Sequence, residues 1–281
     1  MPLLVTPAQL AALRDSAPRV AVLDVRWRLD RPDGHPDYLA GHIPGAVWVD
    51  LDRELASHHA PEDGRHPLPS LETLQAAARR WGLDDGDVVV VYDDWNSLAA
   101  ARAWWLLRRS GVADVRVLDG GFRAWTDAGH PLETDDVVPE PGAVTLKPIL
   151  DGVLTTDGAA QWPAAGVLLD SRAPERYRGD VEPLDPRAGH IPGARNLPAA
   201  AVLEAGRFRD AAALRAAFAE VGATPDVPVA AYCGSGITAA HTALAGALAG
   251  LEVTVYPGSW SAWSNTPGRP VATGAEPGAP G

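Results

Sequence analysis

The residue best suited to chemistry in this sequence is its single cysteine, Cys233. It follows the apolar run Val229–Tyr232 and begins the segment Cys-Gly-Ser-Gly-Ile-Thr, after which small and apolar residues continue. Two glycines in a short loop let successive backbone N–H groups converge, and the N-terminus of a following helix adds partial positive charge. We therefore expect this loop to stabilise a thiolate, the nucleophilic form of cysteine.

Three other interpretations of Cys233 need to be weighed. Free cysteines are often buried and unreactive, but the glycine-rich loop between an expected strand and an expected helix favours a reactive thiol. A cysteine-based phosphatase needs an arginine six residues after the cysteine to clamp the phosphate, and that position is Ala239. A hydrolase would need a base beside the nucleophile, and no clear one stands next to Cys233 in the sequence.

Composition excludes several classes of protein. The chain has 24 basic and 36 acidic residues, a formal net charge of −12, which makes nucleic acid and anionic membranes unexpected partners. One cysteine can form neither an internal disulfide nor a cysteine-based zinc site. The N-terminus lacks a signal-peptide pattern, and the most apolar stretch, 243–251, is too short to span a bilayer. We expect a cytoplasmic enzyme that needs no metal and no organic cofactor.

The sequence also contains one unit twice. The segment Ala-Gly-His-Ile-Pro-Gly-Ala occurs at 40–46 and again at 188–194. Three further pairs of similar segments follow in the same order: 23–26 with 169–172, 88–92 with 228–232, and 120–125 with 258–263. Such a repeat indicates a duplicated domain rather than an array of short repeats.

A length of 281 residues suits two domains of about 100–150 residues each. We predict a first domain over 1–134, a proline-containing linker over 135–148, and a second domain over 149–281 with a Pro- and Gly-rich tail. At the position equivalent to Cys233, the first copy has Asp93 and lacks the glycines. We therefore expect the first domain to be inactive and to act as a scaffold that forms one wall of the site.

Each unit alternates short apolar runs with helical patterns. We expect strands at 20–25, 88–92 and 115–118 in the first unit and at 167–170, 229–232 and 253–256 in the second. The segments expected to be helical are 70–81, 98–109 and 238–248. This alternation predicts an α/β fold in which each domain has a central parallel sheet with helices on both faces. Sites in such folds form at the carboxyl ends of strands, which is where Cys233 lies.

Together these features resemble the two-domain rhodanese-type sulfurtransferases over nearly the whole chain. The resemblance rests on Gly41–Ala46, on its duplicate from Gly189, on the segment Gly120–Trp125 and on the loop at Cys233. It implies an inactive N-terminal domain and a C-terminal domain whose cysteine forms a persulfide. The loop resembles that of the 3-mercaptopyruvate branch, because uncharged residues stand where thiosulfate sulfurtransferases carry basic ones. A monoanionic keto acid needs less positive charge in the loop than a dianion.

The resemblance also implies roles for individual residues. Ser235 matches a loop serine that lies beside the substrate carbonyl, where it could polarise that carbonyl or relay a proton. Arg176 matches an arginine that binds the substrate carboxylate, and Arg187 could be a second one, although its spacing from Arg176 is unusual. Trp27 matches a tryptophan near the pocket, and core packing is its alternative role. The remaining loop residues expected to line the substrate are Gly234, Gly236, Ile237 and Thr238.

His42 resembles the histidine of a proposed serine–histidine–aspartate relay, with Asp33 or Asp37 as its acid. The alternative is structural, because His190 occupies an identical motif in the second copy. Three other histidines lie in a Pro- and Gly-containing loop, where we expect them to be solvated: His58, His59 and His66.

The expected function is transfer of a sulfane sulfur from 3-mercaptopyruvate, through a persulfide on Cys233, to an acceptor. The acceptor would be a thiol, such as reduced thioredoxin or a small thiol, or cyanide in an assay. Two alternatives stay open: the same persulfide chemistry with thiosulfate as donor, and a non-catalytic rhodanese-like module that carries or binds sulfur.

Overall fold

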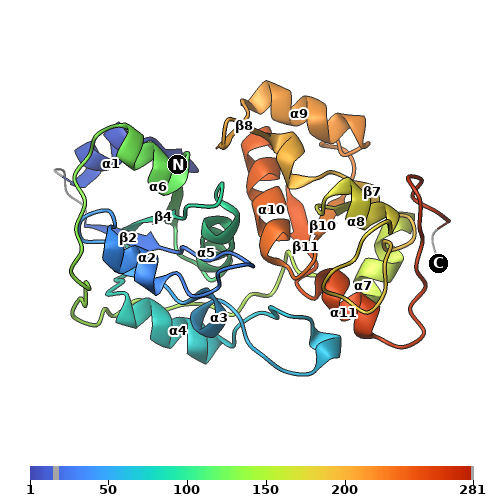
Figure 1. Cartoon of the computed structure of the whole chain (residues 1–281), viewed down its shortest axis with the longest axis horizontal. Helices are drawn as coiled ribbons and strands as arrows, with labels where there is room; N and C mark the ends of the chain where they lie inside the picture. Colours follow the sequence, from blue (N-terminus) through green and yellow to red (C-terminus); the bar gives the residue numbers. More distant parts are fainter. Residues whose placement is uncertain (15–18, 280–281) are drawn as a thin grey trace. The chain divides into compact units, whose positions relative to one another are not determined.

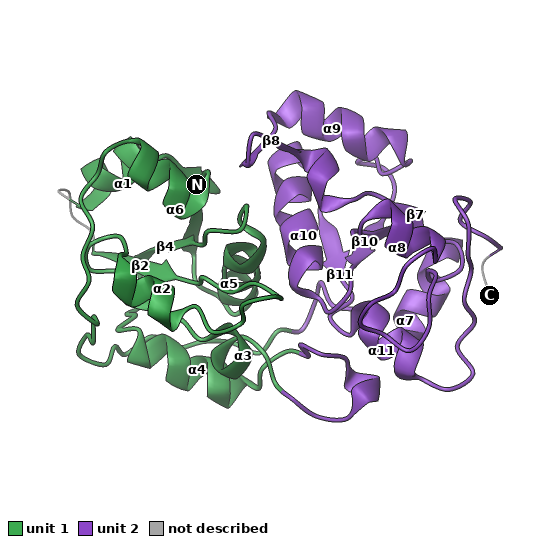
Figure 2. Ribbon diagram, viewed as in Figure 1, with its two compact units in different colours: residues 1–57, 68–149 green, residues 58–67, 150–281 purple. Residues whose placement is uncertain are grey.

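The computed structural model describes residues 1–14 and 19–279, which form two compact units (Figure 1, Figure 2). Unit 1 consists of Met1–Ser57 and Leu68–Ile149, and unit 2 consists of His58–Pro67 and Leu150–Gly281. The segment His58–Pro67 therefore leaves the N-terminal half of the chain and folds with the C-terminal half, which the sequence pattern did not predict.

Unit 1 is built on a parallel sheet with the strand order β1-β5-β4-β2-β3. Its strands are β1 Leu4–Val5, β2 Val20–Asp24, β3 Val47–Trp48, β4 Val88–Tyr92 and β5 Asp114–Leu118. All residues of the central strand β4 are buried, as expected for a strand covered on both faces. The three strands predicted for this unit are confirmed as β2, β4 and β5.

Helices cover both faces of this sheet; Figure 1 shows α1 and α6 on one side and α4 and α5 on the other. The helices are α1 Pro7–Arg14, α2 His35–Ala40, α3 Leu51–Glu54, α4 Leu71–Arg80, α5 Leu98–Arg109 and α6 Gly121–Asp127. α4 begins where the sequence predicts, because the Ser70 hydroxyl accepts a hydrogen bond from the Thr73 N–H and caps the helix.

Unit 2 repeats this design with a parallel sheet in the order β11-β10-β6-β7 and an added antiparallel pair, β8 and β9. Its strands are β6 Val167–Asp170, β7 Arg195–Asn196, β8 Leu203–Glu204, β9 Arg207–Phe208, β10 Val229–Tyr232 and β11 Val253–Val255. Its α-helices are α7 Thr156–Gln161, α8 Pro174–Arg178, α9 Ala211–Glu220, α10 Ile237–Ala249 and α11 Ser259–Asn265. Short 3-10 turns occur at η1 Pro61–Asp63, η2 Trp162–Ala164 and η3 Ala199–Val202. α9 and α10 lie on one side of the sheet, and α7 and α11 on the other (Figure 1).

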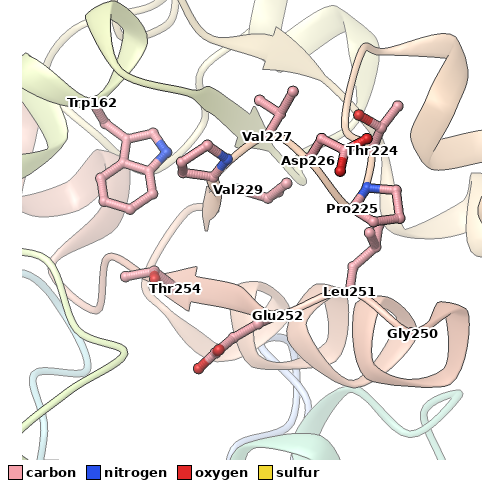
Figure 3. A pocket seen from close by; sticks show the side chains of 11 residues that line it. Trp162, Thr224, Pro225, Asp226, Val227, Val229, Gly250, Leu251, Glu252 and Thr254 are labelled. Atoms are coloured by element: carbon pink, nitrogen blue, oxygen red, sulfur yellow. The ribbon is translucent and has the colours of Figure 1, made fainter.

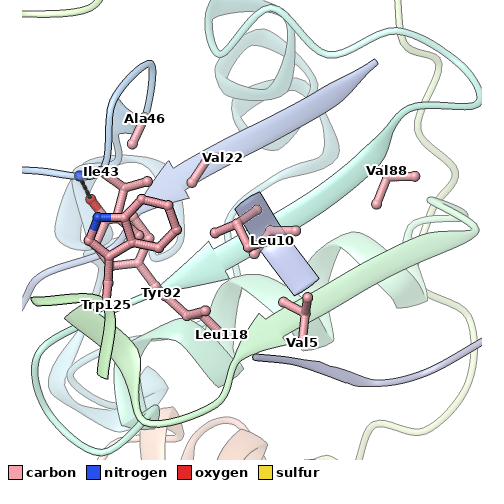
Figure 4. Packing of buried hydrophobic residues seen from close by; sticks show 10 residues of the cluster. Val5, Leu10, Val22, Ile43, Ala46, Val88, Tyr92, Leu118 and Trp125 are labelled. Atoms are coloured by element: carbon pink, nitrogen blue, oxygen red, sulfur yellow. Dashed lines mark hydrogen bonds between the residues drawn. The ribbon is translucent and has the colours of Figure 1, made fainter. Parts of the chain in front are cut away.

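The duplicated sequence motifs build the same polar core in both units. In unit 1, the Tyr92 hydroxyl donates to Asp24 (2.6 Å) and accepts from the Ile43 N–H (3.2 Å; Figure 4). In unit 2, the Tyr232 hydroxyl accepts from the Ile191 N–H at 3.1 Å. Figure 4 also shows aliphatic side chains that share a buried cluster with Tyr92 and Trp125, among them Leu10, Val22 and Leu118. The predicted fold class, two α/β domains with parallel sheets, is confirmed.

The connecting segment 135–148 forms neither helix nor strand and runs along unit 1. The N–H groups of Gly142 and Val144 donate to the carbonyl oxygens of Arg79 and Leu83, at 2.8 and 2.9 Å. The C-terminal tail is bound to unit 2, where Ala272 exchanges backbone hydrogen bonds with His190. Among the residues described, no helix combines the length and the apolar character needed to cross a membrane.

Candidate active site

Cys233 directly follows β10 and begins the short loop that leads into α10, and its side chain is buried. The Gly236 N–H donates to the Cys233 Sγ at 3.1 Å, so the loop folds back onto the sulfur. Gly236 has a φ of 89°, and a Cβ there would lie 2.4 Å from the Pro257 carbonyl oxygen. Only glycine fits this position, which explains a glycine at the start of α10.

The start of α11 holds this loop from a second side. The N–H groups of Trp260 and Ser261 donate to the carbonyl oxygens of Cys233 and Gly234, both at 2.9 Å. The Ser259 hydroxyl oxygen accepts from the Cys233 N–H at 3.1 Å and lies 3.9 Å from Sγ. Sequence reasoning missed Ser259, although a signal existed. Its counterpart in the first copy is Gly121, and both have a positive φ, which is rare for serine.

Two arginines lie over the loop. A Cβ placed on Gly234 would lie 3.2 Å from Nη2 of Arg65 and 3.3 Å from Nη1 of Arg176. Arg176 belongs to α8 and lies beside the loop; the resemblance predicts that it binds the substrate carboxylate. The sequence did not point to Arg65. This residue belongs to the segment His58–Pro67, and no local sequence pattern indicates that this segment folds with unit 2.

The segment that carries Arg65 is fixed to α11. The Arg65 N–H donates to the Ser261 hydroxyl oxygen (3.1 Å), and that hydroxyl donates to the Gly258 carbonyl (3.0 Å). The following residue, His66, is buried, so the prediction that it is solvated is wrong. His58 and His59 are both exposed, as predicted.

Two buried carboxylates hold the arginine pair. Glu182 accepts from Arg176 at 2.7 Å, and Asp185 is ion-paired with Arg65 and lies 3.5 Å from Arg176. The side chains of Glu182 and Asp185 are 3% and 2% exposed, whereas those of Arg176 and Arg65 are 19% and 29% exposed. Burial raises the pKa of the Asp185 carboxyl above its usual value, against the opposing effect of Arg65. The arginines thus face the accessible side of this cluster, as an anion-binding pair requires.

The remaining predicted residues lie in the loop and in the first turn of α10. Ser235 and Ile237 are buried beside Cys233, and the Thr238 carbonyl accepts from the Thr242 hydroxyl at 3.3 Å. Arg187 lies elsewhere in unit 2. Its guanidinium donates to the backbone carbonyls of residues that follow or end α11: Trp263, Ser264, Thr266 and Arg269. These contacts fix the end of α11 and indicate a structural role for Arg187.

His42 and Trp27 belong to unit 1. The His42 ring is fully buried, stacks on Tyr38 at 3.9 Å, and its Nδ1 lies 2.9 Å from the Tyr38 carbonyl oxygen. His190 has the same geometry in unit 2, with its ring 3.8 Å from that of Tyr177. A shared geometry in both copies supports the structural interpretation of His42. Trp27 is buried against Trp95, with ring centroids 6.0 Å apart.

The acids considered for a relay with His42 have other contacts. Asp33 accepts a hydrogen bond from the His35 N–H at 3.1 Å, and Asp37 forms an ion pair with Arg31 at 2.7 Å. Neither contact involves His42, so these two acids give no support for a relay through this histidine.

The equivalent loop of unit 1 binds a carboxylate of the chain itself, that of Asp93. Both oxygens of the buried Asp93 carboxylate accept hydrogen bonds from backbone N–H groups at 2.8 to 2.9 Å, and the donors are Trp95, Ser97, Ala99 and Ala100. Burial raises the pKa of Asp93 to about 6. A strand–loop–helix junction of this kind is therefore an anion-binding cradle, and in unit 1 the chain fills it with its own carboxylate.

A separate pocket of about 340 Å³ lies at the opposite end of the unit 2 sheet, where β10 and β11 begin. Figure 3 shows Trp162, Asp226 and Glu252 among the side chains that line it. None of the predicted site residues lines this pocket. In the described part of the chain, no group of three or more His, Cys, Asp or Glu side chains could hold a metal ion.

Comparisons with known proteins show which family the chain belongs to. The model of the rhodanese-like domain matches residues 6–128 and 155–266. The chain is 50% identical to the "Putative thiosulfate sulfurtransferase SseB" of Mycobacterium tuberculosis, covering 96% of this chain and 97% of that protein. It is 44% identical to the "Probable 3-mercaptopyruvate sulfurtransferase" of Pseudomonas aeruginosa, covering 96% of this chain and 98% of that protein.

Among solved structures, the chain resembles SseA from Escherichia coli, a 3-mercaptopyruvate sulfurtransferase. The TM-score is 0.83 with 33% identity, over 92% of this chain and 99% of SseA. Relatives named for each of the two donors therefore match almost the whole length of the chain. The chain belongs to the rhodanese family: it has two rhodanese-like domains and is a sulfurtransferase.

Proposed function

We propose that the enzyme takes its sulfur from 3-mercaptopyruvate and passes it through a persulfide on Cys233 to a thiol acceptor. The observation that carries this proposal is the position of Arg65 and Arg176 over Gly234. Positive charge lies above the loop rather than within it, so a substrate carboxylate can bind the arginines while its sulfur meets Cys233. The loop itself carries no charged side chain between Cys233 and Thr238.

In the first half-reaction, the Cys233 thiolate attacks the sulfur of 3-mercaptopyruvate. A new S–S bond forms, the C–S bond breaks, and its electron pair stays on carbon as the pyruvate enolate. The Ser235 hydroxyl and the loop N–H groups stabilise that enolate, which then takes up the proton released from the donor thiol and leaves as pyruvate. The outer sulfur of the persulfide lies in the cradle that the Gly236 N–H helps to form.

In the second half-reaction, the thiolate of the acceptor attacks the outer sulfur and releases the Cys233 thiolate. A small thiol or reduced thioredoxin suits this step, and cyanide serves in an assay. The two steps are separated by release of pyruvate, so the kinetics are ping-pong. A reducing compartment such as the cytoplasm would supply the thiol and keep Cys233 reduced.

Unit 1 is inactive in this proposal. Its cradle is filled by Asp93 instead of a thiol, which leaves no nucleophile at the equivalent position. Its role is that of a scaffold.

Thiosulfate is the alternative donor, and the name of the Mycobacterium tuberculosis relative favours it. The two donors are distinguished by kcat/KM measured with each at saturating acceptor. A higher value with 3-mercaptopyruvate supports the proposal, and a higher value with thiosulfate contradicts it. A non-catalytic sulfur carrier would instead retain the added sulfur when thiols are supplied.

A further inference from the structure

Charges of alternating sign extend from the loop into the core of unit 2. Arg176 bridges two carboxylates, with Glu182 at 2.7 Å and Asp185 at 3.5 Å. Beyond Glu182 the series continues to Arg172 at 3.3 Å, and Arg172 binds Asp170 at 2.6 Å. Arg65 ends the series on the accessible side through its ion pair with Asp185.

This arrangement sets the charge near the substrate. The two arginines over the loop are each paired with a buried carboxylate, so the group of four has no net charge before a donor binds. A bound monoanion then leaves one uncompensated negative charge, and a bound dianion leaves two. Because the carboxylates are almost completely removed from water, solvent screens their repulsion of a second substrate charge poorly.

An arginine in this protein can be fixed without carboxylates. Arg187 is held by backbone carbonyls alone, with its Nε, Nη1 and Nη2 each donating to one or two of them. The arginines over the loop are instead fixed by charged partners. Positioning of the arginines alone therefore does not require the negative charge of Glu182 and Asp185.

We propose that Glu182 and Asp185 are positioning residues that determine donor specificity. They aim Arg176 and Arg65 at the loop, and they reduce the positive charge there to a value that suits the monoanionic α-keto acid and disfavours dianionic thiosulfate. This inference rests on the proposed function, since it assumes that donors bind at the arginine pair.

The test uses Asp185→Asn and Glu182→Gln, which preserve side-chain shape and remove one negative charge each. The matched control is Asp180→Asn, because Asp180 lies in the same segment and pairs only peripherally, with the partly exposed Arg178 at 2.7 Å. For each variant kcat/KM is measured with 3-mercaptopyruvate and with thiosulfate at one pH and ionic strength. Thermal unfolding shows whether the variant is folded.

We expect the ratio of kcat/KM for thiosulfate to that for 3-mercaptopyruvate to rise about tenfold in Asp185→Asn, mainly through a lower KM for thiosulfate. Glu182→Gln should raise it in the same direction, and Asp180→Asn should leave it unchanged. A folded Asp185→Asn or Glu182→Gln variant that loses activity equally with both donors has only a structural defect, and that result overturns the inference.

The two proposals fail separately. If the wild-type enzyme prefers thiosulfate, the proposed donor is wrong, whereas a rise of the ratio in Asp185→Asn still supports the charge mechanism. If the wild-type enzyme prefers 3-mercaptopyruvate and the ratio stays constant in both variants, only the further inference fails.

Discussion

The N–H of Gly236 donates to Sγ of Cys233 at 3.1 Å, within a loop whose shape requires a positive φ at this glycine. In unit 1 the equivalent loop directs four N–H groups at the Asp93 carboxylate. The same local structure thus directs a backbone N–H group at a sulfur atom in unit 2 and backbone N–H groups at a carboxylate in unit 1. Backbone N–H groups that converge in this way can stabilise negative charge, and this is the role that the proposed function gives them at Cys233.

Gly236→Ala should lower kcat/KM for sulfur transfer at least about tenfold, because its Cβ would collide with the Pro257 carbonyl and displace the loop N–H from the sulfur. The control is Gly250→Ala at the other end of α10. Gly250 also has a positive φ, of 82°, but a Cβ there meets nothing within 4 Å. Equal activities of the two variants, measured per folded protein, would contradict the assigned role of the loop.

Arg65→Ala and Arg176→Ala should each raise KM for the donor by about 10- to 100-fold, since each removes a charge-assisted hydrogen bond to the substrate carboxylate. Arg178→Ala, on the same helix and paired with the exposed Asp180, should keep the wild-type KM. Steady-state kinetics with varied donor and fixed acceptor measure this. An unchanged KM in Arg65→Ala would remove Arg65 from the site.

Arg187→Ala should lower stability and leave KM unchanged in the folded fraction. Its guanidinium satisfies carbonyl groups at the end of α11, and their loss costs about 1–3 kcal/mol in total. Thermal unfolding together with donor kinetics separates the two effects. A stable Arg187→Ala variant with a raised KM would instead restore Arg187 as a substrate-binding residue.

The Asp93 carboxyl should make unit 1 sensitive to pH. Its pKa in the folded chain is about 6, above the usual value of 3.8, so its contribution to stability is fully present below about pH 4 and is lost as the pH rises through 6. The free energy of unfolding of the wild-type chain minus that of Asp93→Asn should therefore fall by roughly 2–3 kcal/mol between pH 4 and pH 7. A difference that stays constant over this range would contradict the raised pKa.

The sequence predicts those features that short segments determine. The boundaries of α5 and β10 follow from local patterns, and the repeat at 40–46 and 188–194 reveals both domains because each copy rebuilds the same tyrosine-centred core. Cys233 and Arg176 could be proposed as site residues for the same reason, since each belongs to a recognisable motif.

What the sequence could not reveal depends on contacts between distant segments. Arg65 reaches the loop only because His58–Pro67 packs on α11 of the other half of the chain. The burial of His66 has the same cause. The role of Arg187 was equally hidden, because the carbonyl groups that it binds are brought together by the end of α11 and the segment after it.

The most direct test of the account is the intact mass of the reduced protein after one equivalent of 3-mercaptopyruvate, with released pyruvate measured in the same sample. The account predicts a mass increase of one sulfur atom, an equal amount of pyruvate, and loss of the added mass when a thiol is supplied. Cys233→Ser should show neither the added sulfur nor the pyruvate. Pyruvate release by folded Cys233→Ser, or a wild-type protein that gains no sulfur, would contradict the central claim.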